Sequence, residues 1–153
     1  MNPREIEREI QTIIDKETAA WNARDAATLV SIFHPDMVWP WPPNPLAHDP
    51  ASWIFPMGRY DRRRWQESWE ELFRTHDMIH NARRTVRIIV SEQGDGAFAV
   101  VDVDTQWKNR NTGVVSAWQG RAGKGYSKVN GKWLLIYHTG LLKYPHAGMD
   151  DVG

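Results

Sequence analysis

The chain has 153 residues, no cysteine, and equal numbers of basic and acidic side chains, 19 of each. This length fits one domain with a substantial core, so we expect a single domain over residues 1–153. A balanced charge gives no global field to attract nucleic acid or an anionic membrane. Without cysteine there is no disulfide framework, thiol nucleophile or thiolate metal site. The charged start MNPREIEREI and the lack of a membrane-length apolar run predict a soluble, cytoplasmic protein.

Three amphipathic helices are predicted in the first half of the chain. Residues 3–24 place apolar side chains at helical spacings, and a shorter helix fits residues 26–34. The third helix is predicted over residues 61–76, where Asp61 is a plausible N-cap and Trp65 begins an aromatic stripe.

The segment WPWPPNPLAHDPASWIFP, residues 39–56, is too rich in proline for a regular element beyond a short strand near Val38. Proline stiffens such a loop, and its aromatic rings, including Trp39 and Trp41, supply apolar area. Two interpretations stand open. The segment is either a lid or side wall of a ligand pocket, or a loop packed permanently over one end of the fold.

From about residue 85 the apolar period becomes two residues, which is typical of β-strands. Four strands are predicted, over residues 85–92, 97–109, 114–129 and 132–140. Turn sequences separate them, and Asn130-Gly131 is a strong signal for a two-residue hairpin. Helices followed by an antiparallel meander indicate an α+β fold with the helices packed on one face of a curved sheet. Residues 144–153 are expected to form a frayed tail.

The stretch VVDVDTQW puts two aspartates, Asp102 and Asp104, on the same face of a strand. A two-residue turn at Asn111-Thr112, or a four-residue loop over residues 110–113, would place Arg121 opposite Asp102 and Gln119 opposite Asp104. Because Arg121 can reach both carboxylates, we expect the three charged groups to form the polar floor of a pocket.

The Asn130-Gly131 turn would bring Gly123 opposite His138 and Gly125 opposite Ile136. One face of the sheet then collects Phe98, Val100, Asp102, Asp104, Gln119, Arg121, Gly123, Gly125, Ile136 and His138. The other face collects Val101, Val103, Trp107, Trp118, Lys124, Tyr126, Trp133 and Tyr137. The charged groups and the two glycines predict a polar-tipped cavity on the first face.

Two alternatives to this cavity stand open. Acid–arginine pairs on sheets are commonly solvated surface pairs worth less than about 1 kcal/mol, and antiparallel sheets often leave one face wet. A three-residue turn at NTG, or one bulge in the third strand, would move Arg121 to the face opposite the aspartates.

The segments AAWNARD, FHPDMVW and GRAGKGYSKVNGKWLLIYHTG resemble the nuclear transport factor 2-like superfamily. The resemblance is to its SnoaL-like branch and to the association domain of calcium/calmodulin-dependent kinase II, over most of residues 5–142 apart from the insert at 39–56. It implies a cone-shaped α+β barrel in which three helices pack on a strongly curved, mainly antiparallel sheet around a pocket. It also implies a homodimer, or a larger ring, formed through the outer sheet face, which would carry Trp107 and Trp118.

Within this resemblance, Arg121 matches the pocket arginine of SnoaL-like members, whereas Lys124 falls where the association domain carries its comparable arginine. The identity of the pocket cation therefore stays open. His138 matches the closing histidine to within one residue. Enzymes of the superfamily use a pocket aspartate, or an aspartate–histidine pair, for proton transfer, and other members are binding or assembly modules without chemistry.

We therefore expect a domain that binds a small, partly apolar organic molecule in its barrel. It would act either by cofactor-independent isomerase, dehydratase or hydrolase chemistry, or as a non-catalytic oligomerisation or ligand-sensing domain. The candidate catalytic residues are Asp102, His138 and Asp104, and the candidate ligand-binding residues are Arg121, Trp39, Trp41, Trp65, Gln119 and Tyr126. An adjacent arginine favours the ionised aspartate, which makes His138 the better proton shuttle.

No metal, cofactor or nucleic-acid partner is predicted. The segment HDMIH, residues 76–80, resembles a zincin helix only superficially, because it lacks the central glutamate and a third ligand. The arginines of RYDRRRW, residues 59–65, precede a run of glutamates and fit a solvated helix face better than a phosphate site.

Overall fold

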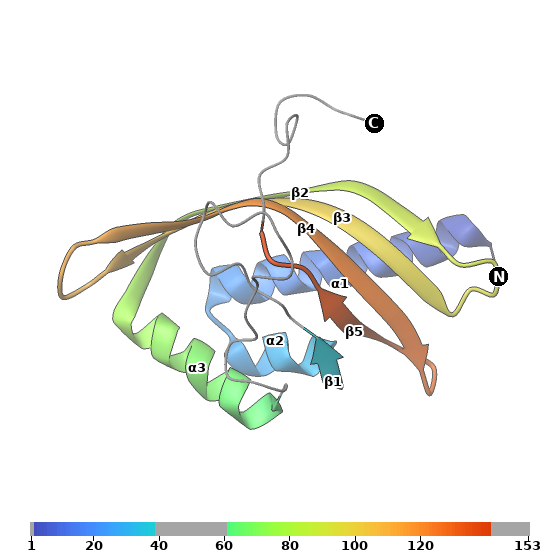
Figure 1. The fold of residues 1–153 in the computed structure, drawn as a ribbon, viewed down its shortest axis with the longest axis horizontal. Coiled ribbons are helices and arrows are strands. Elements are labelled where there is room, and N and C mark those ends of the chain that lie inside the picture. Colours follow the sequence, from blue (N-terminus) through green and yellow to red (C-terminus); the bar gives the residue numbers. More distant parts are fainter. Residues whose placement is uncertain (1, 39–60, 142–153) are drawn as a thin grey trace, which may run out of the picture.

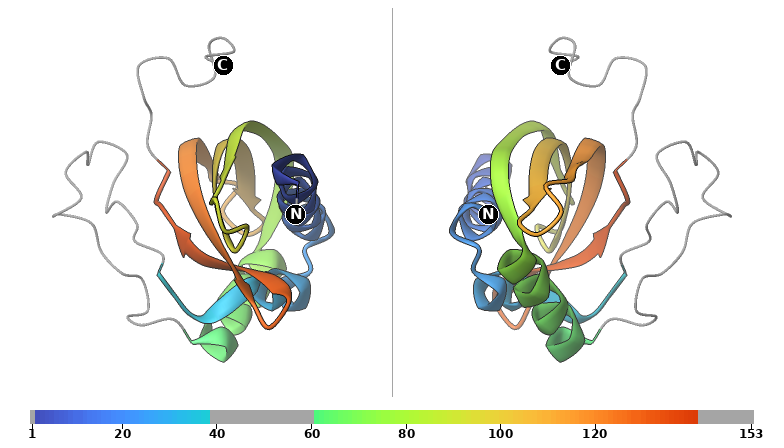
Figure 2. Two further views of the ribbon diagram at one scale, coloured as in Figure 1. Left: turned by 90° about the vertical axis from the view of Figure 1, so that its right-hand side faces the viewer. Right: turned by 90° about the vertical axis from the view of Figure 1, so that its left-hand side faces the viewer.

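The computed structural model of the chain describes residues 2–38 and 61–141. These residues form three helices and five strands, in the order α1 (Pro3–Ala23), α2 (Ala26–Ile32), β1 (Phe33–Val38), α3 (Arg62–Thr75), β2 (His76–Val90), β3 (Gly96–Asn109), β4 (Val115–Val129) and β5 (Lys132–His138). The strands make one bent sheet in the order β1-β5-β4-β3-β2, with the helices gathered on one side of it (Figures 1 and 2). Only the β1–β5 pair is parallel. The predicted α+β fold is confirmed, although β1 and β2 are edges of a sheet that does not close.

The helix boundaries follow from capping side chains. Asn2 accepts a hydrogen bond from the backbone N–H of Arg4 at 2.9 Å and starts α1, and Pro3 occupies the first turn. As predicted, Asp61 caps α3, accepting from the backbone N–H of Arg64 at 3.1 Å. These caps orient the apolar stripes of both helices toward the sheet.

Two boundaries differ from the sequence prediction. The second helix ends at Ile32 rather than at residue 34, and the chain continues directly as β1. The strand β2 begins at His76, so the segment HDMIH is extended rather than the end of a helix. This segment lacks a clear local strand pattern, and its pairing with β3, from His76 opposite Asn109, is what makes it a strand.

The predicted register between β3 and β4 is correct. Asp102 pairs with Arg121, and Asp104 pairs with Gln119. The predicted register between β4 and β5 fails near the bulge between Gly125 and Tyr126. Beyond this irregularity, Lys124 rather than Gly123 lies opposite His138, so His138 points to the same side of the sheet as Lys124.

The assignment of the two sheet faces to inside and outside was inverted. In β3 the alternate residues that face the helices are buried, and these are Ala99, Val101, Val103, Thr105 and Trp107. Asp102, Asp104 and Arg121 therefore lie on the outer face. Trp107, expected to be partner-facing, is fully buried, and Trp118 packs against the core. The reason is physical: the helices cover the face with the larger aromatic area.

The core at one end of the sheet is a cluster of aromatic rings. Trp21 of α1 makes edge-to-face contacts with Trp69 at 5.3 Å, Phe73 at 5.8 Å, Trp118 at 5.5 Å and Trp107 at 6.4 Å between ring centroids. Such contacts favour one ring arrangement over others and fix the C-terminal half of α1 on the sheet.

Candidate functional site

The predicted catalytic residues are not brought together. His138 is buried on the concave face, whereas Asp102 and Asp104 lie on the opposite face of the same sheet. The predicted ligand contacts divide in the same way. Tyr126 and Trp65 are buried inside, and Arg121 and Gln119 lie on the outer face. Trp39, Trp41 and the segment 144–153, for which a frayed tail was predicted, fall outside the described residues.

On the outer face, Asp102 is held by two arginines. Arg121 donates to its carboxylate from Nε at 2.7 Å and from Nη2 at 3.1 Å, and Arg84 of β2 donates at 2.9 Å. The hydrogen bonds from Arg121 outweigh the effect of burial and lower the pKa of Asp102. Arg84 escaped the sequence prediction because its strand, β2, was expected only from residue 85 onward. An aspartate bound this way is a structural anion rather than a proton acceptor.

Asp104 fits the solvated alternative. Its side chain is 46% exposed, and it accepts a hydrogen bond from Gln119 at 2.9 Å and lies 3.3 Å from the imidazole of His80.

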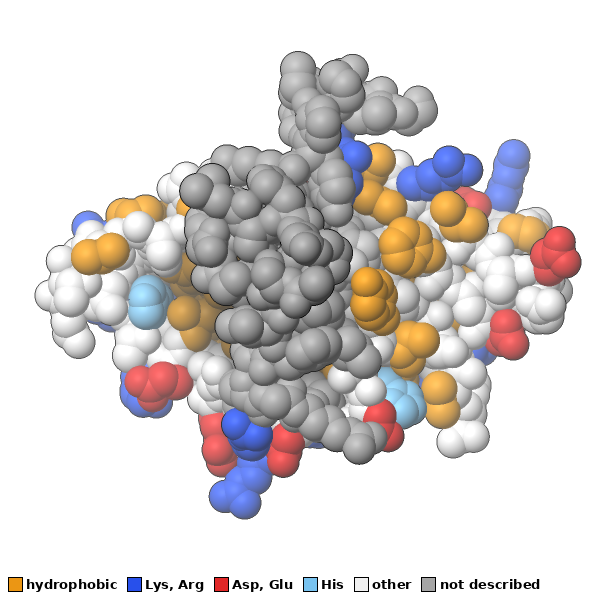
Figure 3. All heavy atoms as spheres, viewed as in Figure 1, with side chains coloured by type: hydrophobic (Ala, Val, Ile, Leu, Met, Phe, Trp, Pro, Cys, Tyr) orange, Lys and Arg blue, Asp and Glu red, His pale blue; other side chains and the backbone are white. Residues whose placement is uncertain are grey.

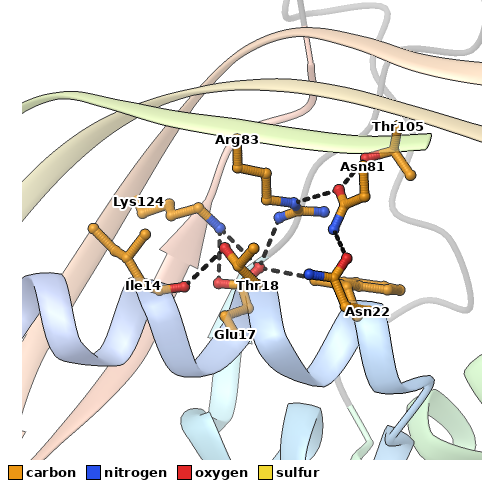
Figure 4. A network of polar contacts seen from close by, with 9 residues as sticks. Ile14, Glu17, Thr18, Asn22, Asn81, Arg83, Thr105 and Lys124 are labelled. Carbon is orange, nitrogen blue, oxygen red and sulfur yellow. Dashed lines mark hydrogen bonds and ion pairs between the residues drawn. The ribbon is translucent and has the colours of Figure 1, made fainter.

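The buried charges lie on the concave side, between α1 and the sheet. Glu17 of α1 accepts two hydrogen bonds from Nζ of Lys124, at 2.9 and 3.0 Å, and lies 3.3 Å from Nη1 of Arg83 (Figure 4). The indole N–H of Trp21 also donates to Glu17, at 3.2 Å. The side chains of Glu17, Arg83 and Lys124 are 2%, 7% and 1% exposed. We call these three residues the interior ion cluster.

Amide side chains hold the interior ion cluster in place. Asn81 accepts from Nε of Arg83 at 3.1 Å and from the hydroxyl of Thr105 at 2.8 Å, and it donates to Asn22 at 2.8 Å (Figure 4). The guanidinium of Arg83 also lies over the ring of Trp21, 5.5 Å from its centroid. Arg83 is thereby pre-organised before any ligand arrives.

The cluster has more positive than negative charge. Burial alone would raise the pKa of Glu17, but the charges of Lys124 and Arg83 outweigh burial and lower this pKa from 4.5 to about 2. Burial and the charge of Lys124 lower the pKa of His138 well below 6.5, so His138 is neutral at pH 7. Burial also lowers the pKa of Lys124, and the opposing charge of Glu17 favours its protonated form. Two basic side chains thus face one carboxylate.

Tyr126 adds a polar group beside this cluster. Its side chain is buried, and within residues 2–38 and 61–141 its hydroxyl has no hydrogen-bond partner. Burial raises the pKa of this phenol well above 10, and the charge of Glu17 raises it further. A buried hydroxyl without an acceptor is a donor that a ligand oxygen can use.

Sequence reasoning missed Glu17 and Arg83. A signal for Glu17 existed, because it occupies the buried stripe of α1 between Ile14 and Trp21, where a charge needs a buried partner. Lys124 was one of two candidates for the pocket cation, and the structure places it, not Arg121, on the concave side.

No protein-family model and no curated protein matches the sequence, but solved structures match its fold. A ketosteroid isomerase-like protein from Erwinia carotovora atroseptica is 20% identical, with a TM-score of 0.62 over 85% of this chain and 90% of that one. A nuclear transport factor 2-like protein of unknown function from Pseudomonas putida is 19% identical, with a TM-score of 0.55 over 87% and 83%. A candidate calcium/calmodulin-dependent protein kinase II association domain from Xanthomonas campestris is 21% identical, with a TM-score of 0.56 over 90% and 87%.

The chain has the nuclear transport factor 2-like fold. The predicted resemblance is confirmed at this level, since such identities establish the fold alone. Within residues 2–38 and 61–141, no three His, Cys, Asp or Glu side chains gather as a metal site would require. No helix in the same part of the chain is long and apolar enough to cross a membrane.

Proposed function

We propose that the protein binds a small, partly apolar organic molecule with an anionic or enolisable oxygen at the interior ion cluster. The observation that carries this proposal is the excess of buried positive charge, in which Arg83 and Lys124 face the single carboxylate of Glu17. An uncompensated charge is costly away from water, and a bound oxyanion would offset that cost.

The surroundings suit such a ligand. Electrostatic interactions are stronger in a buried site than in water, so fixed cations there stabilise a developing oxyanion effectively. Trp21, which contacts both Glu17 and Arg83, belongs to an aromatic cluster suited to an apolar body.

The proposed chemistry is cofactor-independent proton transfer of the isomerase or dehydratase type. Lys124 and Arg83 would stabilise the enolate, Tyr126 would donate a hydrogen bond to it, and the neutral imidazole of His138 would carry the proton. The ketosteroid isomerase-like neighbour supports this class. In this proposal Asp102 and Asp104 are no longer assigned a catalytic role. Arg121 and Gln119 are no longer assigned to ligand binding.

A second function, assembly with another copy of this chain, is favoured by the outer sheet face. Ile89, Phe98, Ile136 and Tyr137 are 48%, 41%, 37% and 38% exposed there. Figure 3 shows hydrophobic side chains gathered where β4 and β5 run. Such a patch on the sheet marks an interaction surface, and the association-domain neighbour supports a homodimer. These four residues would form the interface in place of Trp107 and Trp118.

Native mass spectrometry of gently purified protein tests the ligand proposal. We expect a retained small molecule in the wild type and in Arg84→Met, and its loss in Arg83→Met. The two arginines are adjacent in β2 but face opposite sides of the sheet, which makes Arg84 the matched control. A wild type without added mass, or equal retention in both variants, would contradict the proposal.

A further inference from the structure

A hollow lies on the surface, away from the interior ion cluster. It has a volume of about 400 Å³ and is bounded by α1, the end of α2 and the hairpin of β4 and β5, which lie side by side (Figure 2). The charged lining residues are Glu9, Lys16, Lys128 and Lys132. We call this hollow the hairpin groove. Its volume falls within the range of small-molecule sites, which starts at roughly 300 Å³.

The wall of the hairpin groove is apolar and fixed. Its apolar lining residues are Ile13, which is half-buried, and the core residues Ile32 and Trp133, which are 3% and 7% exposed. The indole N–H of Trp133 donates to the carboxylate of Glu9 at 2.7 Å, and the ammonium of Lys128 lies over the ring, 5.8 Å from its centroid. These two contacts hold the ring in one orientation before a ligand binds, so little conformational entropy is lost on binding.

The rim of the groove has a surplus of positive charge. Three lysines line it against one glutamate, and that glutamate is already engaged by Trp133. The chain as a whole carries 19 side chains of each sign, so this surplus is local. A local field of this kind attracts a compact anion, whereas the neutral chain as a whole is a poor match for a polyanion.

We propose that the hairpin groove binds a small organic anion with a flat apolar body, such as an aryl carboxylate. The apolar body would lie against Ile13 and the small exposed part of Trp133, and the carboxylate would pair with Lys16 and Lys132 at the rim. This site uses none of the residues of the interior ion cluster, so it stands independently of the function proposed above.

Dansylglycine, a fluorescent aryl carboxylate, tests this site, with neutral dansylamide as the matched probe. We expect the wild type to bind dansylglycine at least tenfold more tightly than dansylamide. The double variant Lys16→Glu/Lys132→Glu should weaken dansylglycine binding by roughly tenfold or more, because two attractive charges become repulsive. Both lysines are exposed, so the variant should unfold at the wild-type temperature. Lys108→Glu, an exposed lysine outside the groove, should bind like the wild type.

Three results would overturn the inference. The first is no binding of dansylglycine to the wild type. The second is equal binding of the charged and neutral probes. The third is unchanged affinity in Lys16→Glu/Lys132→Glu, which would place the probe elsewhere, including at the interior ion cluster. None of these results bears on the retained molecule expected at Arg83, so the two proposals fail separately.

Discussion

At the scale of single residues, Glu17 is the carboxylate of the interior ion cluster. Among residues 2–38 and 61–141 it is the only acceptor for the ammonium of Lys124, and both groups are almost completely buried. A buried carboxylate paired in this way stabilises the folded state only while it is ionised. The pair therefore connects the stability of the fold to the chemistry proposed for the site.

The first prediction concerns acid stability. The pKa of Glu17 is lowered from 4.5 to about 2, so its contribution is complete above pH 4.5 and is lost as the pH falls toward 2. The shift corresponds to about 3 kcal/mol of unfolding free energy. Glu17→Gln should remove this dependence and lower stability at pH 7, because it leaves two buried cations unpaired.

Chemical denaturation across pH measures both effects, and the exposed Glu7→Gln on α1 is the control. Equal pH profiles for the wild type and Glu17→Gln would refute the role assigned to this pair.

The second prediction concerns Tyr126. Tyr126→Phe removes only a buried hydroxyl without a partner among the described residues, so we expect the unfolding free energy to rise by about 1 kcal/mol. Tyr137→Phe, at an exposed tyrosine of β5, should change it little. Urea denaturation measures the unfolding free energy of both variants. A loss of stability in Tyr126→Phe would show that the hydroxyl makes a hydrogen bond in the unliganded fold.

At the scale of elements, Arg110 joins the β3–β4 turn to the end of α3. Its guanidinium donates to the carboxylate of Asp77 at 2.8 Å and to the backbone carbonyls of Phe73 and Arg74. These carbonyls belong to the last turn of α3, where no further helical N–H is available to them. One surface side chain thus helps to hold α3, and with it Trp69, against Trp21.

The third prediction follows from this contact. Arg110→Ala should lower the melting temperature by about 2 to 4 °C, because the helix end loses its donors. Arg63→Ala removes only an exposed pair with Glu67 within α3 and should change the melting temperature by much less. Differential scanning calorimetry compares the two variants, and equal melting temperatures would show that Arg110 does not act as a cap.

At the scale of the whole molecule, the outer sheet face is the surface that we propose joins two copies of the chain. Phe98 lies over Gly123, where an added Cβ would come within 2.8 Å of its ring. The glycine thereby makes room for an exposed aromatic side chain at the centre of the patch.

The fourth prediction tests this face. If it joins two copies, Phe98→Glu should raise the dimer dissociation constant by roughly a hundredfold or more, since a charge would be buried at the interface. Val114→Glu, at an exposed position beside the β3–β4 turn, should leave it unchanged. Analytical ultracentrifugation distinguishes these cases, and a wild-type monomer would argue against assembly through this face.

Much of the fold could be predicted from the sequence, and the site could not. A four-residue loop over residues 110–113, one of the two turns predicted for this hairpin, gives the observed pairing of Asp102 with Arg121. Which face is inside could not be read from the pattern, because both faces carry large apolar side chains and only helix packing decides between them. The bulge beside Gly125 turns His138 inward. It could not be predicted, because the glycine-rich sequence of β4 does not mark where a bulge will form.

The central claim is that the interior ion cluster, and not the outer Arg121–Asp102 pair, binds the ligand. Calorimetric titration with phenylpyruvate, an anionic and enolisable aryl keto acid, tests it most directly in a Lys16→Glu/Lys132→Glu background, where the hairpin groove does not contribute. We expect this background and its Arg121→Met variant to bind with the same affinity, and its Lys124→Met variant to bind at least tenfold more weakly. Equal affinity with and without Lys124→Met, or a loss confined to Arg121→Met, would contradict the account.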